Sequence, residues 1–172
     1  MDFKEINDKI SAFRLPRWHE IPSIGLYLSQ TIMMIEDWLQ TYTEITHEKV
    51  LTKTMVNNYV KEKIIRAPQN KMYDQVSIAS LLVISILKSN YNINDISKLI
   101  SIALEVDNPE ASYNRFCDAI EKAVKQAFCG QISPPIISLT DEQYLMQNVG
   151  YSFAGKLYVQ AALMARGLIK AE

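Results

Sequence analysis

Residues 54–100 read TMVNNYVKEKIIRAPQNKMYDQVSIASLLVISILKSNYNINDISKLI, and this stretch decides the fold. Its first apolar residues recur at helical spacing after Thr52, whose hydroxyl can accept the free N–H groups of a first turn. Pro68 prevents a helix from continuing, and the polar residues that follow it favour a turn. We therefore expect a short helix over residues 52–62, followed by a small hairpin in which residues 70–73 are extended.

Helix start signals divide the chain from residue 74 onward. Asp74 can cap a helix that begins at Gln75 and is apolar nearly all round, which is typical of a helix at the centre of its domain. Asn92 can cap the next helix, and Asn108-Pro109 starts another, with proline at the first helical position. That helix should stop at Gly130.

Two further helices are expected, one before residue 52 and one near the C-terminus. An apolar pattern predicts a helix over about 23–41, and the polar residues 41–49 predict a connection. Near the C-terminus, Ser133-Pro134-Pro135 is the best linker candidate, and Thr140 begins a capping-box pattern for a last helix with a break near Gly150. The expected fold is all-α, a helical bundle with one short hairpin.

Positive charge is concentrated in residues 49–73. The whole chain has 18 Lys and Arg against 19 Asp and Glu, so its net charge is −1. Residues 49–73 hold six basic residues and one acid, a local charge of +5. Because neutralising DNA phosphates releases counterions, such a segment favours binding to duplex DNA.

The helix over 52–62 should present polar side chains to solvent, because its apolar residues turn inward. The residues left facing outward are Lys53, Thr54, Asn57, Asn58 and Lys61. Asparagine can form two hydrogen bonds with adenine, and lysine can reach guanine or phosphate. We expect Asn57 and Lys61 to contact base edges or phosphates, and Arg66 and Lys71 to contact the DNA backbone.

The order of these parts resembles the winged helix-turn-helix of MerR-type regulators over residues 54–100. Tyr59 stands where that family keeps the second tyrosine of its Arg-Tyr-Tyr pattern. Ile64-Ile65 stand at the Leu-Leu after its turn, and Lys71-Met72-Tyr73 resembles the Arg-x-Tyr of its wing. The resemblance implies that the 52–62 helix and the 66–73 wing read duplex DNA.

The chain departs from the MerR pattern at several positions. Asn57-Asn58 replace its Arg and first Tyr, Lys63 replaces its turn glycine, and the wing is several residues shorter. The long dimerising coiled coil is also missing, because Asn108-Pro109 interrupts the chain. MerR-type proteins work as dimers, so the resemblance implies a homodimer in which the residues from 110 onward supply the contact.

The whole chain, from Leu15-Pro16-Arg17-Trp18 through Tyr27 and onward, resembles an uncharacterised bacterial family, the domain-of-unknown-function family numbered eighteen thirty-six. With the MerR-like segment, this resemblance implies a transcriptional regulator, to which a small-molecule effector could also bind. We expect residues 1–107 to form the N-terminal helix and the DNA-binding part, and residues 108–172 to serve dimerisation or effector binding. The alternative is a helical module that binds another protein and no DNA.

The sequence indicates no other kind of site. It has no Gly-x-Gly-x-x-Gly, P-loop or Gly-x-Ser-x-Gly motif, and His19 and His47 lack metal-ligand spacing, so we expect no enzyme, cofactor or metal site. Cys117 and Cys129 would lie on different faces of one helix, and no signal peptide is evident, which predicts a cytoplasmic protein. The most apolar stretch, Val76–Leu87, is too short to cross a bilayer.

Overall fold

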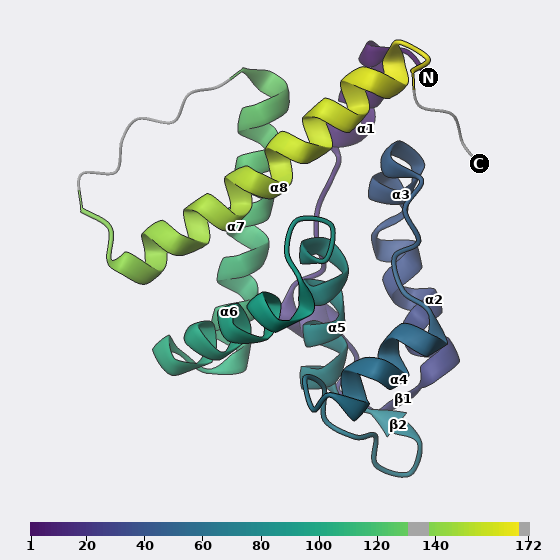
Figure 1. Cartoon of the computed structure of the whole chain (residues 1–172), viewed down its shortest axis with the longest axis vertical. Helices are drawn as coiled ribbons and strands as arrows, with labels where there is room; N and C mark the ends of the chain where they lie inside the picture. The colour runs from purple at the N-terminus through teal and green to yellow at the C-terminus, as the bar shows by residue number, and fades with distance from the viewer. Residues whose placement is uncertain (131–137, 169–172) are drawn as a thin grey trace. The chain divides into compact units, whose positions relative to one another are not determined.

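The computed structural model of the chain describes residues 1–130 and 138–168 and is mostly helical (Figure 1). In chain order its elements are α1 (Phe3–Ser11), the 3-10 helix η1 (Trp18–Glu20), β1 (Leu26–Tyr27), α2 (Leu28–Trp38), α3 (Gln40–Thr46), α4 (Lys53–Lys61), β2 (Met72–Tyr73), α5 (Gln75–Leu87), α6 (Ile93–Val106), α7 (Pro109–Cys129) and α8 (Asp141–Ala165). Within the described ranges, the only sheet pairs β1 with β2. The expected all-α class is therefore confirmed.

These elements form two compact units, each of which combines separate segments of the chain. Unit 1 contains Met1–Leu15, Thr41–Glu48 and Arg115–Glu172, and unit 2 contains Pro16–Gln40 and Lys49–Asn114. The expected division into residues 1–107 and 108–172 does not follow these units, and as a division of function it stays a prediction.

Helix α5 is the buried helix of unit 2. Asp74 caps it, because the side chain accepts a hydrogen bond of 2.8 Å from the N–H of Ser77. Its buried apolar residues lie all round the helix and include Ile78, Leu81, Leu82, Ile84 and Ile86. The buried hydroxyl of Ser85 donates to the carbonyl of Leu81 at 2.8 Å, so no polar group is left unsatisfied there. The burial that its composition predicted is confirmed.

The next two helix starts are also confirmed. Asn92 accepts a hydrogen bond from the N–H of Asp95 at the start of α6, and Asn108 accepts one from Ala111 at the start of α7. Helix α7 ends at Cys129, and Gly130 follows with a φ of 64°, a left-handed conformation that favours glycine.

A short antiparallel sheet joins the start of unit 2 to the hairpin that precedes α5. Leu26 lies opposite Tyr73, and Tyr27 lies opposite Met72. The expected extended stretch is therefore present at residues 72–73, but its partner strand lies in a segment that was expected to be helical. Gly25 allows the two strands to approach, since a Cβ at this position would lie 2.9 Å from the Cβ of Met72.

The prediction for the N-terminal part needs correction. Residues 23–41 do not form one helix, because α2 begins only after β1, at Leu28, and ends at Trp38. The expected connection over residues 41–49 is wrong, since it contains most of α3, whose Tyr42 and Ile45 are buried. Polar residues between these two positions conceal the helical spacing, and α1 was not predicted at all.

Helix α8 begins with the predicted capping box. The N–H of Gln143 donates to the hydroxyl of Thr140 at 3.3 Å, and the N–H of Thr140 donates to Gln143 Oε1 at 3.1 Å. The predicted break near Gly150 is wrong, because α8 runs unbroken from Asp141 to Ala165. The linker candidate at residues 133–135 lies outside the described residues.

Gly150 is the point of close approach between α7 and α8 in unit 1. A Cβ at this position would lie 3.0 Å from the carbonyl oxygen of Ala119 and 3.3 Å from the Cβ of Ala123. Aromatic rings from α1, α7 and α8 pack together in the same unit, and they are Phe3, Phe128 and Tyr158. Glycine in α8 is thus a packing residue and not a helix break.

Replacing Gly25 with alanine should destabilise unit 2, because the added methyl group would overlap Met72 and separate β1 from β2. We expect the free energy of unfolding in urea to fall by about 1–3 kcal/mol. Ser101→Ala, at an exposed position of α6, is the control and should change it by less than about 0.5 kcal/mol. An unchanged unfolding midpoint for Gly25→Ala would contradict the close pairing of the strands.

Candidate nucleic-acid interface

Helix α4 exposes the polar face that its sequence predicted. Thr52 caps the helix by accepting a hydrogen bond of 3.2 Å from the N–H of Met55, and Val56 is fully buried. The residues expected to face outward are all exposed, and they are Lys53, Thr54, Asn57, Asn58 and Lys61. Tyr59 is half-buried, and burial followed by the charge of Glu62 raises the pKa of its hydroxyl. This tyrosine stays protonated and belongs to the inner side of the helix.

The chain leaves α4 through a left-handed turn at Lys63, whose φ is 59°. The N–H of Lys63 donates to the carbonyl of Val60 at 3.0 Å. The N–H of Ile64 donates to the carbonyl of Tyr59 at 2.9 Å, which completes a Schellman motif. Glycine is the usual residue at the left-handed position of this motif, and an exposed lysine occupies it here.

A second left-handed turn forms the tip of the hairpin. Gln69 and Met72 exchange backbone hydrogen bonds of 3.0 and 2.8 Å. Between them, Asn70 and Lys71 have φ values of 49° and 64°. Two consecutive positive φ values are typical of a type I′ turn, in which glycine is favoured and lysine is not. Lys71 and Arg66 are both exposed, as contacts with a DNA backbone would require.

Strand β2 of the hairpin is fixed in two ways. The side chain of its Tyr73 is buried, and its backbone pairs with β1. Burial raises the pKa of the Tyr73 hydroxyl, so this ring is a neutral part of the core. Sequence analysis missed Tyr27 as a candidate site residue, although it lies opposite Met72 and is 53% exposed. Its spacing of three residues from Ile24 fits the helix expected over 23–41, so no local signal marked Tyr27 as a neighbour of the hairpin.

In the described part of the chain, the basic residues of this segment are not neutralised by acidic partners. Across residues 1–130 and 138–168, no acidic side chain pairs with any of five exposed basic residues, Lys53, Lys61, Lys63, Arg66 and Lys71. The local charge of +5 therefore faces solvent. A concentrated field of this kind attracts a polyanion and raises its rate of association.

The geometry differs from a standard helix-turn-helix in one respect. Helices α2 and α4 contact each other in unit 2, yet residues 39–52 lie between them in the chain. A standard motif joins its two helices by a turn of three or four residues. Any kinship with the MerR type therefore depends on the order α4, hairpin, α5 and α6 rather than on the turn.

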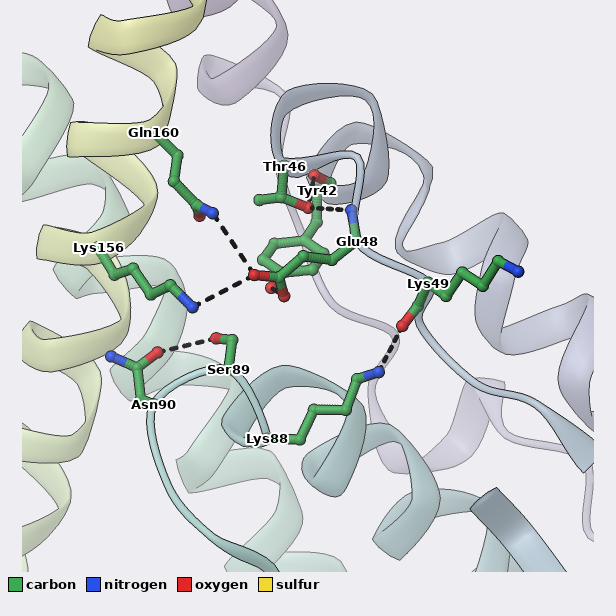
Figure 2. A network of polar contacts seen from close by, with 9 residues as sticks. All are labelled: Tyr42, Thr46, Glu48, Lys49, Lys88, Ser89, Asn90, Lys156 and Gln160. Carbon is green, nitrogen blue, oxygen red and sulfur yellow. Dashed lines mark hydrogen bonds and ion pairs between the residues drawn. The ribbon is translucent and has the colours of Figure 1, made fainter. Parts of the chain in front are cut away.

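Lys88 holds the segment that leads into α4 within unit 2 (Figure 2). Its ammonium group donates to the carbonyl of Lys49, and it lies 3.8 Å from the sulfur of Met55. Lys88 is the C-cap residue of α5. The start of α4 is thus fixed to the end of the buried helix.

A separate polar cluster surrounds Glu48 in unit 1 (Figure 2). Its carboxylate accepts hydrogen bonds from Tyr42 Oη at 2.7 Å, Lys156 Nζ at 3.2 Å and Gln160 Nε2 at 3.5 Å. Burial alone would raise the pKa of Glu48, but these hydrogen bonds and the charge of Lys156 hold that pKa below its ordinary value. The cluster ties residues 41–48 to α8, which is a structural role.

The chain thus combines an all-α fold with an exposed basic helix and hairpin. It belongs to the family described as Domain of unknown function (DUF1836), which matches residues 16–116, more than half of the chain. The match begins at Pro16, where unit 2 begins, and ends close to its last residue, Asn114. The family expected from the sequence is therefore confirmed. No curated protein and no solved structure matches the chain.

The described part of the chain has neither a candidate membrane span nor a candidate metal cluster. None of its helices has the length and apolar character that a membrane span requires. No group of three or more His, Cys, Asp or Glu side chains in it is arranged to hold a metal ion. Cys117 is buried and Cys129 is exposed, and neither takes part in a disulfide bond.

Glu48→Gln should change how the stability of unit 1 depends on pH. Because folding lowers the pKa of Glu48, the carboxylate adds stability above its ordinary pKa of 4.5, and this stability is lost as the pH falls through the lowered value. In thermal melts from about pH 7 to about pH 3, the variant should melt below the wild type at neutral pH, with a difference that shrinks on acidification. Glu105→Gln, at an exposed position, should melt with the wild type throughout. A constant difference for Glu48→Gln would contradict the assignment.

Proposed function

We propose that this chain is a DNA-binding transcriptional regulator of the MerR-like winged helix-turn-helix type. In this function α4 contacts the bases of duplex DNA, and residues 66–73 act as the wing. One observation carries the proposal: the basic and amide side chains of α4 and the hairpin are exposed and unpaired, within a segment of charge +5 in a chain of charge −1.

The spacing of the α4 side chains suits a DNA groove. Lys53, Asn57 and Lys61 follow one another at intervals of four residues, so they form one stripe along the helix. The major groove accommodates an α-helix, and asparagine can form two hydrogen bonds with adenine there. Lysines before and after Asn57 would contact phosphates or guanine and fix the helix in the groove.

Lys63 and Lys71 support the same function, because their left-handed backbone lowers the stability of the fold. A non-glycine residue in this conformation costs roughly 1–2 kcal/mol. Lys63 and Lys71 both bear that cost while their side chains reach into solvent. Backbone strain of this kind clusters at functional sites, where the side chain serves something other than stability.

A helical protein-interaction module is the second candidate, because large apolar side chains of unit 2 are exposed. Leu104 and Val106, near the C-terminal end of α6, are 45% and 50% exposed, and of the residues of α6 only Ile96 is buried. Such a module has no need of the basic segment. Salt-dependent binding to duplex DNA therefore separates the two functions.

Fluorescence anisotropy of a labelled DNA duplex, titrated with the full chain at several NaCl concentrations, tests the proposal. We expect affinity to fall steeply as salt rises. Lys53→Ala and Lys61→Ala should each weaken binding and reduce the salt slope by about 1, because each removes a phosphate contact. Asn57→Ala should cost about 1–3 kcal/mol on a duplex selected from random sequence, and much less on unselected DNA.

Lys98→Ala is the matched control for these lysine variants. Lys98 is an exposed lysine of α6 in the same unit but outside the basic segment. Its loss should leave both the affinity and the salt slope unchanged. If the wild-type chain binds no duplex at low salt, the DNA proposal fails and the interaction module takes its place.

Lys63→Gly and Lys71→Gly should separate stability from DNA binding. Glycine relieves about 1–2 kcal/mol of left-handed strain but loses about 0.5–1 kcal/mol more entropy on folding. The free energy of unfolding should therefore stay equal or rise by up to about 1.5 kcal/mol, while DNA affinity falls with the lost charge.

Lys63→Gln is the control for the glycine variants, because it removes the charge and keeps the strain. It should weaken DNA binding without any gain in stability. Glycine variants that bind DNA as tightly as the wild type would show that neither lysine serves the proposed interface.

A further inference from the structure

Helix α8 carries a heptad pattern of exposed side chains on the side opposite its buried face. Its buried residues run from Val149 to Ala161 and lie on one face. Around the other side, residues follow at alternating intervals of four and three, and they are Tyr144, Asn148, Tyr151, Gly155, Tyr158 and Ala162. Ala162 is half-buried and the other five are exposed, although the ring of Tyr158 also packs against Phe3 and Phe128 of its own chain. This spacing is that of the seam of a two-stranded coiled coil.

Large and small side chains alternate along this α8 seam. Tyrosine recurs at every seventh residue, and Asn148, Gly155 and Ala162 lie between the tyrosines. Apart from its chain neighbours and the nearby backbone of its own helix, nothing lies within 4 Å of the position of a Cβ at Gly155, so space is open there. Tyr144 is 61% exposed and Tyr151 is 43% exposed. When two such helices pair, the rings of one can pack densely over the small residues of the other. If rings met rings instead, gaps would remain beside the small residues.

We propose that the α8 seam pairs with the same seam of a second copy of this chain, in antiparallel orientation. One register places Tyr151 of each copy over Gly155 of the other. The same register places Tyr144 over Ala162 and brings the hydroxyl of Tyr158 to the amide of Asn148. Each tyrosine then meets a small or polar residue, and the open space at Gly155 is filled.

The remaining exposed apolar residues of α8 fit this register. Leu145 and Val159 are 38% and 56% exposed and share one heptad position beside the seam. In an antiparallel pair, residues at this position meet across the interface, so Leu145 of one copy contacts Val159 of the other. One interface therefore covers the exposed large apolar side chains of α8 described above.

Charge at the two ends of α8 selects the antiparallel orientation. Asp141 and Glu142 are exposed at its first turn, and Arg166 is exposed directly after its last residue. Antiparallel pairing brings Arg166 of each copy to the acidic end of the other and opposes the two helix dipoles. Parallel pairing would bring the two acidic ends together, which is unfavourable.

This interface lies in unit 1 and does not depend on DNA binding by α4. The resemblance to MerR-type proteins implied only a dimer whose contact lies in the residues from 110 onward. The α8 seam is argued from its own exposure, size pattern and charge. Its test is an association measurement without DNA, so its outcome and that of the DNA titration are independent.

Sedimentation equilibrium of the full chain tests the pairing. We expect the mass of a dimer that falls toward a monomer on dilution. Gly155→Gln should raise the dissociation constant about tenfold or more, because its side chain fills the space that Tyr151 of the other copy occupies. The variant should fold at least as stably as the wild type, since glycine inside a helix costs about 1 kcal/mol and nothing in its own chain lies nearby.

Leu104→Gln is the matched control, because it removes an exposed apolar side chain from a different helix and should leave the dimer intact. Orientation is tested by oxidising a mixture of two variants, Leu145→Cys and Val159→Cys, each with Cys129→Ser. Antiparallel pairing predicts cross-links between the two different variants. A monomer at every concentration, a dimer unaffected by Gly155→Gln, or cross-links within each variant alone would overturn the proposal.

Discussion

The burial of α5 is the constraint on which unit 2 depends. Its apolar side chains point in every direction, so neighbouring segments must cover it on all sides to remove them from water. Buried Tyr73 and the cap residue Asp74 attach the hairpin to its first turn. At its other end, Lys88 binds the segment that leads into α4. Both parts of the candidate interface are therefore anchored to one rigid helix, which suits a surface that must present several side chains in fixed positions.

The candidate interface and the α8 seam use different physical interactions in different units. The candidate interface has exposed charge, polar side chains and strained backbone. Removing this polar surface from water would contribute little hydrophobic free energy. The seam has aromatic and small side chains whose exposure to water is unfavourable until another surface covers them. Local charge of +5 is compatible with a chain of net charge −1 because all the acids but Glu62 lie outside residues 49–73. Those acids limit indiscriminate attraction of the chain to polyanions.

Local chemistry made the helix starts and the exposed face of α4 predictable. Thr52, Asp74 and Thr140 each accept a backbone N–H within three residues, and helical periodicity placed Asn57 and Lys61 outward. What could not be predicted depends on distant partners or on unusual conformations. The strand at Leu26 is defined by Tyr73, and no property of lysine indicates the left-handed backbone at Lys63 and Lys71. Helix α3 was missed because its apolar residues are few and separated by polar ones.

The pairing of β1 with β2 has a consequence for the order of folding. Its strands are separated by the whole of α2, α3 and α4, so closing this contact costs far more chain entropy than closing the turn at Asn70-Lys71. Contacts of such long sequence separation form late and slow the folding of a domain. The hairpin tip can close early, but it becomes a fixed part of the surface only when residues 26–27 return to it. During synthesis, both strands have left the ribosome once residue 73 has emerged. At that point α5, which ends at Leu87, is not yet complete.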